Sequence, residues 1–330
     1  MFKSLFNKKV SIEQELIINI FTEKLPKNSY ARISLEAFAR GIRNIGDECN
    51  IIDSLEYKEC DIAVIFGDVR DAPSKKKRMR LKAEVIGRHR GKGLIVIDTP
   101  VLTRPYDKNE KYRRVGIDSL FADTGKFNNQ NSLCDRWKIL SEKFGIKIQE
   151  KEKEKKGDNI YILLQRFYDA SLRGSQRLRP KKYFAWLDSV IKELENETDR
   201  KIIIRPHPGS LNAKEELDLI ENFKLKIDNN KIFDYEQKAL FDVLDDAFAT
   251  ICYNSGSAID SLLYGVPNIT YDSGSHAYTV ANNNCKDIES IVMPDISQWL
   301  CDLGYVDWSI YDLEQGLAWK HLKKEVLKYI

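Results

Sequence analysis

Apolar residues near the start of the chain recur at a spacing close to that of a helix. Ile12, Leu16, Ile20 and Phe21 follow this spacing, so the pattern predicts a helix from Ser11 to Leu25. The chain is therefore expected to open with helical structure.

Short apolar runs follow, separated by further helical segments. Ser34 is a candidate cap for a second helix that runs through Gly41. A long basic helix is expected from about Ser74 to His89, and the apolar runs 50–52, 62–68 and 94–98 are candidate strands. Strands that alternate with helices in this way are typical of a parallel α/β domain.

A charged run without any apolar side chain, residues 149–158, interrupts this alternation. Such a run is typical of a solvated linker and predicts a domain boundary. The alternation then resumes, with strands expected at 160–164, 201–205, 249–252 and 268–271, and helices at 183–194, from about 213, at 237–244 and at 257–263. We therefore expect two Rossmann-like α/β domains, residues 1–150 and 151–330, the second ending in a helical tail from 296 to 330.

The length and composition agree with two folded domains. A chain of 330 residues, 42% hydrophobic and 31% charged, would form two units of about 150 residues each. No run reaches the roughly 18 apolar residues of a membrane span, and the first residues lack a signal-peptide pattern, so a cytoplasmic protein is expected. The six cysteines are scattered without a CxxC motif, which predicts neither a zinc site nor a disulfide framework.

The formal net charge of +3 is small, but basic residues gather between Arg70 and Arg114. Two interpretations remain open. The stretch is a solvated helix face, or it binds an anionic acceptor such as DNA, a phospholipid surface or an acidic glycan. Lys76, Arg80 and Arg88 are the acceptor-side candidates within it.

Three polar loops follow predicted strands of the second half, and open parallel sheets bind their ligands at those strand ends. The first loop runs from Gln165, a candidate donor-binding residue, to Ser171. Asp169 within it is placed to take a proton from an incoming hydroxyl, as a general base must. A cap on a helix or turn explains Asp169 equally well.

The second loop, Arg205 to Ser210, holds a single histidine between two prolines. The prolines restrict the backbone, so the imidazole of His207 is expected to be presented rigidly at the strand end. Arg205 beside it is able to pair with phosphate oxygens. The pair suits a phosphate leaving group, although a lone histidine is often structural.

The third loop opens a predicted helix with Asn254, Ser255, Gly256 and Ser257. Free backbone N–H groups and the two serine hydroxyls can hold a phosphate there, although ordinary N-capping also explains one serine. The remaining donor-binding candidates near this loop are Asp260, Ser273 and His276. An ordinary turn explains the segment that holds Ser273 and His276 equally well.

No Asp-x-Asp motif follows a strand, because Asp245 and Asp246 lie in a probable helix. The charge of a leaving group would then be met by Arg205, His207 and the helix N-terminus, so neither a metal nor a cofactor is expected. The sequence also lacks GxGxxG, P-loop and GxSxG motifs, which disfavours dehydrogenase, kinase and α/β-hydrolase functions.

At the three loops the sequence resembles the retaining β-Kdo transferases of bacterial capsule synthesis and their GT-B relatives. The matching segments are Gln165 to Ser171, Arg205 to Pro208, and Asn254 to Pro267, and the resemblance covers roughly residues 158–281. It implies a metal-independent GT-B glycosyltransferase whose second domain holds a UDP- or CMP-linked sugar donor.

The same resemblance implies roles for individual residues. Asp169 would be the acid/base or nucleophilic carboxylate. Arg205 and His207 would hold the donor phosphate, and Ser255 with Ser257 would complete the phosphate cradle.

The stretch 307–319 resembles the end of phage-encoded proteins of this type. Two acceptors therefore remain open, a glycan or glycolipid and the hydroxymethylated bases of phage DNA. A sugar-nucleotide epimerase or a non-catalytic sugar-nucleotide binder is the alternative from another class. The sugar, the nucleotide and the stereochemical outcome are not determined by the sequence.

Overall fold

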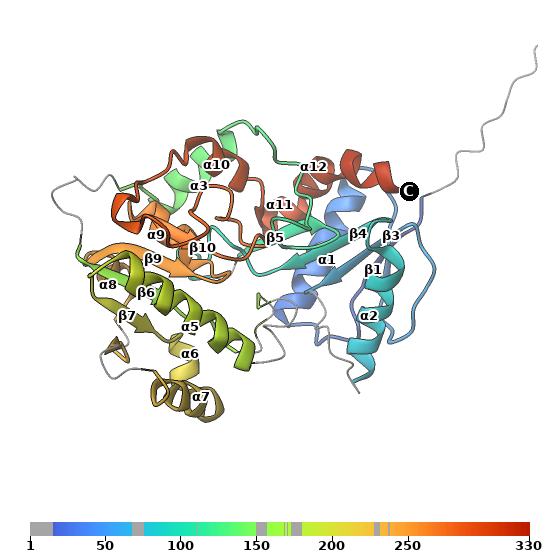
Figure 1. Cartoon of the computed structure of the whole chain (residues 1–330). Coiled ribbons are helices and arrows are strands. Elements are labelled where there is room, and N and C mark those ends of the chain that lie inside the picture. Colours follow the sequence, from blue (N-terminus) through green and yellow to red (C-terminus); the bar gives the residue numbers. More distant parts are fainter. Residues whose placement is uncertain are drawn as a thin grey trace, which may run out of the picture.

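The computed structural model describes residues 16–67, 76–109, 111–149, 157–167, 169, 171–172, 180–227, 232–236 and 238–330. Two α/β lobes lie side by side, each built around one sheet (Figure 1). We call the lobe around the first sheet the N-terminal lobe and the lobe around the second sheet the C-terminal lobe.

The sheet of the N-terminal lobe has six strands in the order β11-β5-β4-β3-β1-β2. Their bounds are β1 (Ile18–Phe21), β2 (Asn50–Ile52), β3 (Ile62–Phe66), β4 (Leu94–Asp98), β5 (Tyr112–Ile117) and β11 (Asp307–Ser309). The first four strands pair in parallel, whereas β5 is antiparallel to both of its neighbours, β4 and β11.

The expected opening helix is wrong over its described part, because residues 18–21 form strand β1. All four side chains of β1 are buried, as in a central parallel strand that is covered on both faces. A short apolar run of this kind has no period of its own, so periodicity does not separate it from a buried helix. Residues 11–15 lie outside the described part of the chain.

The sheet of the C-terminal lobe has five parallel strands in the order β10-β9-β6-β7-β8. Their bounds are β6 (Asn159–Leu163), β7 (Ile202–Arg205), β8 (Ile232–Phe233), β9 (Ala247–Cys252) and β10 (Asn268–Thr270). The four longer strands confirm the strands expected in this half, while the two-residue strand β8 carries too little pattern to be predicted.

Helices cover both faces of each sheet. Those of the N-terminal lobe are α1 (Tyr30–Asn44), α2 (Lys77–His89), α11 (Ile310–Glu314) and α12 (Leu317–Val326). Those of the C-terminal lobe are α3 (Asp135–Phe144), α5 (Pro180–Glu197), α6 (Pro208–Leu211), α7 (Lys214–Lys224), α8 (Leu240–Leu244), α9 (Ser257–Leu263) and α10 (Ser297–Leu303). Short 3-10 turns lie at Ile288–Ser290 and Leu327–Tyr329. None of the described helices is long and apolar enough to cross a membrane.

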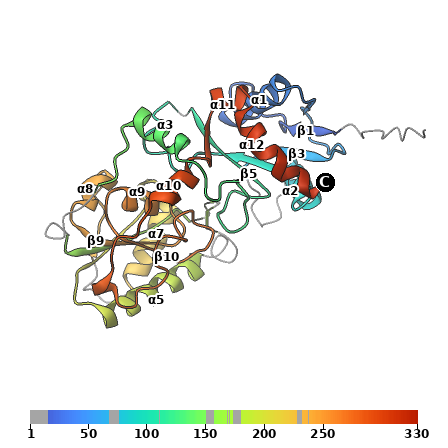
Figure 2. The ribbon, with the colours of Figure 1, turned by 90° about the horizontal axis from the view of Figure 1, so that it is seen from above.

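Two segments pack on the far side of the boundary expected near residue 150. Helix α3 contacts α10 and contributes Leu140 to the core of the C-terminal lobe. Strand β11 with α11 and α12 returns to the N-terminal lobe, where α11 lies against α1 (Figure 2). Trp319 of α12 is fully buried in the core of that lobe. The tail therefore completes the first sheet and its core, and the two packed units are not the segments 1–150 and 151–330.

Cys134, just before α3, and Cys301, in α10, form a disulfide with their Cα atoms 4.4 Å apart. The scattered spacing of the cysteines predicted no disulfide framework, and this expectation is wrong for one pair. The two residues are 167 positions apart in sequence and meet only because α3 packs against α10.

Candidate active site

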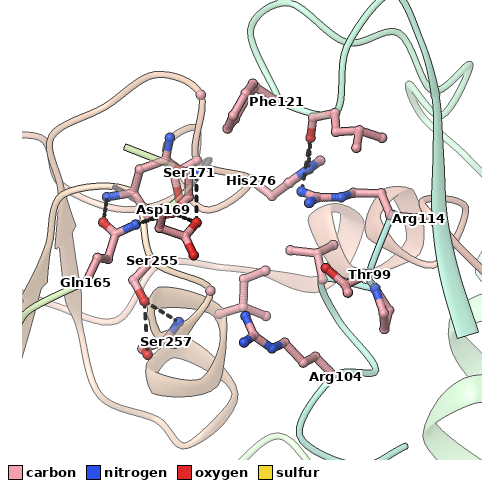
Figure 3. A pocket seen from close by; sticks show the side chains of 18 of the residues that line it. Thr99, Arg104, Arg114, Phe121, Gln165, Asp169, Ser171, Ser255, Ser257 and His276 are labelled. Carbon is pink, nitrogen blue, oxygen red and sulfur yellow. Dashed lines mark hydrogen bonds between the residues drawn. The ribbon is translucent and has the colours of Figure 1, made fainter. Parts of the chain in front are cut away.

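A cleft of about 640 Å³ lies between the two lobes. Its walls are the segments that follow β4 and β5 in the N-terminal lobe and the segments that follow β6, β7, β9 and β10 in the C-terminal lobe. Both sheets thus direct polar loops into one space, and Figure 3 shows side chains from the two lobes facing each other across it.

Asp169 lies in the segment after β6, and its side chain is exposed in the cleft (Figure 3). Its Oδ1 atom accepts hydrogen bonds from the backbone N of Ser171 at 2.8 Å and from the Ser171 hydroxyl at 2.9 Å. The carboxylate therefore caps a turn and also faces the cleft, so the two interpretations of Asp169 are compatible.

Gln165 is buried and joins the segment after β6 to the segment after β9. Its Oε1 accepts the backbone N–H of Asn254 at 2.7 Å, and its Nε2 donates to the Asn254 carbonyl at 3.1 Å and to the Ser171 hydroxyl at 2.6 Å. The Asn254 side chain donates to Asp272 at 3.0 Å. Both residues line the cleft, but their amide groups bond to the protein, so they hold the walls in place.

His207 lines the cleft at the start of α6, with Pro208 as the first helical residue. The backbone N–H of Gly209 donates to Nδ1 of His207 at 2.9 Å, which places the proton of the neutral ring on Nε2. Burial lowers the pKa of His207, and the positive charges of Arg104 and Arg166 lower it further. The ring is thus a neutral hydrogen-bond donor at physiological pH.

Arg205 was expected to hold phosphate, but it does not line the cleft. Its buried guanidinium pairs with Asp234 at 2.7 Å and donates to the Lys238 carbonyl. Arg166 lines the cleft instead, and it is held by the buried carboxylate of Glu216 at 2.5 Å. The sequence thus located segments that reach the cleft, but Arg166, the arginine that lines it there, was not among the residues singled out.

Ser255, Gly256 and Ser257 line the cleft at the start of α9. The Ser255 hydroxyl accepts the backbone N–H of Ser257 at 3.2 Å and lies 3.1 Å from the Ser257 hydroxyl. Asp260, one turn further on, also lines the cleft. Burial raises the pKa of Asp260 to about 7, against the opposing charge of Arg104 across the cleft.

The last two candidates connect the lobes. The exposed Ser273 does not line the cleft and donates to Asp123 of the N-terminal lobe at 2.6 Å. His276 lines the cleft, and its Nε2 lies 3.1 Å from the carbonyl oxygen of Leu120. Burial lowers the pKa of His276 to about 3, and the nearby Arg114 contributes to this shift.

The N-terminal lobe supplies two arginines that the sequence analysis did not single out as site residues. Arg104 follows β4 and is exposed, and Arg114 lies on β5, with both side chains reaching into the cleft (Figure 3). Nη1 of Arg114 donates to the Leu120 carbonyl at 3.1 Å, while its Nε is buried and lacks a hydrogen-bond partner in the described part of the chain. Arg104 was detectable by its place after an apolar strand, whereas Arg114 belongs to a strand that the pattern missed.

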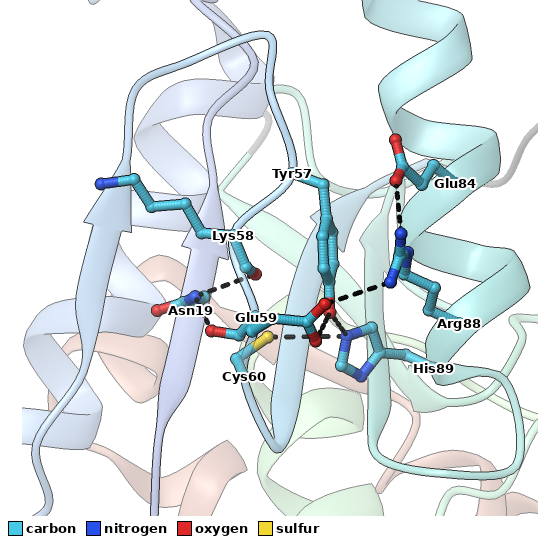
Figure 4. Close-up of polar contacts among 8 residues, drawn as sticks. All are labelled: Asn19, Tyr57, Lys58, Glu59, Cys60, Glu84, Arg88 and His89. Atoms are coloured by element: carbon cyan, nitrogen blue, oxygen red, sulfur yellow. Dashed lines mark hydrogen bonds and ion pairs between the residues drawn. The ribbon is translucent and has the colours of Figure 1, made fainter.

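The acceptor-side candidates Lys76, Arg80 and Arg88 do not line the cleft. Arg88 lies near the end of α2, where it pairs with Glu59 at 3.1 Å and Glu84 at 3.0 Å (Figure 4). Its guanidinium also stacks 4.3 Å from the ring centre of Tyr57. Arg88 therefore belongs to a polar cluster beside the amino end of β3, at the edge of the sheet opposite the cleft.

No group of three or more His, Cys, Asp or Glu side chains suited to a metal ion occurs among the described residues. The aspartate pair considered for a metal lies elsewhere, with Asp245 at the end of α8 and Asp246 before β9. Metal independence stays a prediction for experiment.

No protein-family model and no curated protein matches the sequence. Among solved structures, the chain is similar to the KpsC beta Kdo 2,4 transferase of Thermosulfurimonas dismutans, with 11% identity, a TM-score of 0.52, and coverage of 92% of this chain and 98% of that one. It also aligns with the beta Kdo 2,7 transferase of the same KpsC, with 10% identity, a TM-score of 0.49, and coverage of 94% and 100%. A third alignment is with UDP-GlcNAc 2-epimerase of Methanocaldococcus jannaschii, with 13% identity, a TM-score of 0.29, and coverage of 83% and 90%.

The first of these alignments concerns the fold, and it agrees with the topology described above. Two sheets dominated by parallel strands, each covered by helices on both faces, enclose a cleft at the ends of their strands. The chain therefore has the GT-B architecture of two Rossmann-like lobes, with helices of its C-terminal tail packed on the first lobe.

Proposed function

We propose that this protein is a glycosyltransferase that binds a nucleotide-activated sugar in the cleft and transfers the sugar to a glycan or glycolipid without a metal ion. The observation that carries the proposal is the charge distribution of the cleft. Arg104 and Arg114 from one lobe and Arg166 and His207 from the other line the same cleft as the exposed carboxylate of Asp169. Cationic donors on both walls suit a phosphate-bearing substrate, and the carboxylate suits proton transfer.

The unpartnered Nε of Arg114 supports an anionic ligand in particular. A guanidinium taken out of water is costly unless its donors find acceptors. Asp98 and Asp307 act on Arg114 from the neighbouring strands and oppose the lowering of its pKa by burial. An oxyanion of a bound substrate would supply the missing acceptor from the cleft side.

The proposed reaction uses the chain's own groups. The bond between the anomeric carbon and the phosphate oxygen breaks, and the nucleotide leaves with the bonding electron pair. The acceptor hydroxyl oxygen bonds to the anomeric carbon, and its proton passes to the carboxylate of Asp169. His207, with its proton on Nε2, donates a hydrogen bond to the departing phosphate, which stabilises the charge that develops there.

The pairing of the basic side chains on α2 favours a glycan or glycolipid over DNA as the acceptor. Arg78 and Lys82 lie 3.7 Å and 3.6 Å from the buried carboxylate of Glu23, and Arg88 pairs with Glu59 and Glu84. DNA binding depends on cations that are available to neutralise many phosphates. Three cations of α2 are instead matched within the protein.

The test is a panel of UDP- and CMP-linked sugars, scored by thermal stabilisation and by slow hydrolysis of the donor in the absence of an acceptor. At least one donor should raise the melting temperature, and Arg114→Gln and His207→Ala should each weaken its binding roughly tenfold or more, because each removes a charged or directed donor. Arg200→Gln is the matched control, since Arg200 pairs with Glu289 away from the cleft.

Other outcomes would overturn the proposal. If no nucleotide sugar stabilises the wild-type protein, or if Arg200→Gln weakens binding as much as the cleft variants do, the donor site is wrong. Release of an epimerised nucleotide sugar would show an epimerase. Binding with neither hydrolysis nor transfer to any glycan would show a sugar-nucleotide binder.

A further inference from the structure

The segment after β4 lines the cleft and carries Arg104, and its backbone N–H groups need hydrogen-bond acceptors. Val101, Leu102 and Thr103 present three successive backbone N–H groups, and Leu102 and Thr103 are fully buried. Buried backbone donors are almost always paired in native proteins. Whatever accepts these three bonds determines where Arg104 lies.

One carboxylate from the C-terminal tail accepts all three bonds. Oδ2 of Asp307 accepts from the backbone N atoms of Leu102 at 2.9 Å and Thr103 at 2.8 Å, and from the Thr103 hydroxyl at 3.1 Å. Oδ1 accepts from Val101 N at 3.0 Å. Asp307 is fully buried, and successive N–H groups around a carboxylate form a concave anion site that an uncharged side chain fills poorly.

Asp307 also lies beside the second arginine of the cleft. It is on β11, in register with Arg114 of the neighbouring strand β5, and Arg114 is in register with Asp98 on β4. The tail strand therefore places one carboxylate beside Arg114 and against the backbone of the three residues that precede Arg104. These residues are about 200 positions apart in sequence, as the separations of 204 to 206 between bonded residues show.

We infer that Asp307 is a positioning residue of the donor site, whose carboxylate holds the segment 101–103 so that the guanidinium of Arg104 stays in the cleft. The inference rests on the proposed function for the identity of the ligand, a nucleotide phosphate. By this inference the C-terminal tail supports substrate binding through Asp307, although no residue of the tail lines the cleft.

His207 reports the position of Arg104 without any ligand. The charged groups that act on its ring are Arg104 and Arg166, which lower its pKa, and Asp169 and Glu216, which raise it. Moving Arg104 out of the cleft should therefore raise the pKa of His207. Loss of the negative charge of Asp307 with no movement of Arg104 would instead lower it or leave it unchanged, so the two cases differ in sign.

The experiment is an NMR titration of the imidazoles of the full chain, which has four histidines. Asp307→Asn places an NH₂ group or a neutral oxygen against the three backbone donors, so the pKa of His207 should rise by on the order of 0.5. Arg104→Gln should raise it by at least as much, and the double variant should match Arg104→Gln alone. The affinities for UDP and CMP should fall by roughly tenfold in the same non-additive way.

Two further variants keep the test decisive. Asp47→Asn disturbs the tail elsewhere, where Asp47 accepts from Trp319 and Lys323, and it should leave the pKa of His207 unchanged. Thr103→Val removes a single bond to Asp307 and serves if Asp307→Asn does not fold, with a smaller rise expected.

The inference is overturned if folded Asp307→Asn, or Thr103→Val in its place, leaves the pKa of His207 unchanged or lowers it. It is also overturned if the losses of affinity from Asp307→Asn and Arg104→Gln add up. A rise in pKa in a protein that binds no nucleotide would uphold the positioning of Arg104 and reject the proposed function instead.

Discussion

His276 and Arg114 donate to the same acceptor, the carbonyl oxygen of Leu120, each at 3.1 Å. Because a carbonyl only accepts, the bond places the proton of the neutral His276 ring on Nε2. A second proton would have to enter at Nδ1, beside the fixed positive charge of Arg114. The two side chains thus join β5 to the segment after β10. Burial and the charge of Arg114 keep His276 neutral.

This arrangement predicts an acid-dependent loss of stability. The pKa of His276 is lowered to about 3, so between about pH 6.5 and pH 3 the unfolded chain binds a proton that the folded chain does not. As the pH decreases through that window, His276 should lower the free energy of unfolding by up to about 1.4 kcal/mol per pH unit. In His276→Gln the amide can still donate to Leu120, so urea unfolding from pH 6 to pH 4.5 should show a shallower decline. Equal slopes for the two proteins would contradict the prediction.

The buried amide of Gln165 should contribute strongly to stability, because it makes two bonds to Asn254 in the segment after β9 and a third to Ser171 in its own segment after β6. Gln165→Leu keeps the volume but leaves buried groups of Asn254 unpaired, at about 1–3 kcal/mol for each group. Urea unfolding measures the loss. Gln298→Leu is the matched control, since the exposed Gln298 also bonds through its amide and should change stability by less than about 1 kcal/mol.

Asp169→Asn should separate binding from turnover. An asparagine oxygen can still accept the bonds from Ser171, so the turn and the donor affinity should survive, while loss of the charge should lower turnover by about a hundredfold or more. Donor affinity, melting temperature and transfer rate should be measured together on this variant. Asp188→Asn, on the outer helix α5, is the control. A fully active Asp169→Asn enzyme would remove the catalytic assignment.

Nucleotide binding should not need a divalent metal ion, because cationic side chains line both walls of the cleft. The thermal stabilisation by a nucleotide sugar should therefore be the same in EDTA as in Mg²⁺. Abolition of binding or turnover by EDTA, restored by added metal, would show that a metal site has been missed.

Charge reversal on α2 tests the acceptor side. Lys76→Glu with Arg80→Glu should spare donor hydrolysis but reduce transfer to a large anionic acceptor, and the effect should shrink at high salt. Arg88→Glu is the comparison, because Arg88 is paired with Glu59 and Glu84 at the other edge of the sheet. If the double variant and the parent protein transfer sugar equally well at low salt, this end of the helix is an ordinary solvated surface and does not bind the acceptor.

The sequence was sufficient for the four longer strands of the C-terminal lobe and for much of its wall of the cleft. The strands ending at Leu163, Arg205, Cys252 and Thr270 are apolar runs between polar loops, and the parallel sheet places the ends of such runs at one edge. Of the residues singled out there, Gln165, Asp169, His207 and the Ser255 to Ser257 segment do line the cleft. The apolar pattern of the strands, together with the tendency of parallel sheets to bind ligands at the carboxyl ends of their strands, is enough to locate these residues.

Only the tertiary structure decided which charged side chains enter the cleft. The guanidinium of Arg205 pairs with Asp234, which follows another strand, and does not reach the cleft. Arg114 reaches the cleft from β5, which pairs with β11 near the end of the chain. No periodicity encodes such pairings, because they depend on which segments meet after folding.

The N-terminal lobe and the tail show the same limit. Strand β1 is buried on both faces and therefore carries no alternation. The tail shows a helical pattern, but whether its apolar face covers one sheet or the other follows from the strand pairing of β11 with β5 and the packing of α11 on α1. The sequence thus determined which segments are apolar and which loops are polar, and the pairing of distant segments decided that Asp307 and Arg104 belong to one site.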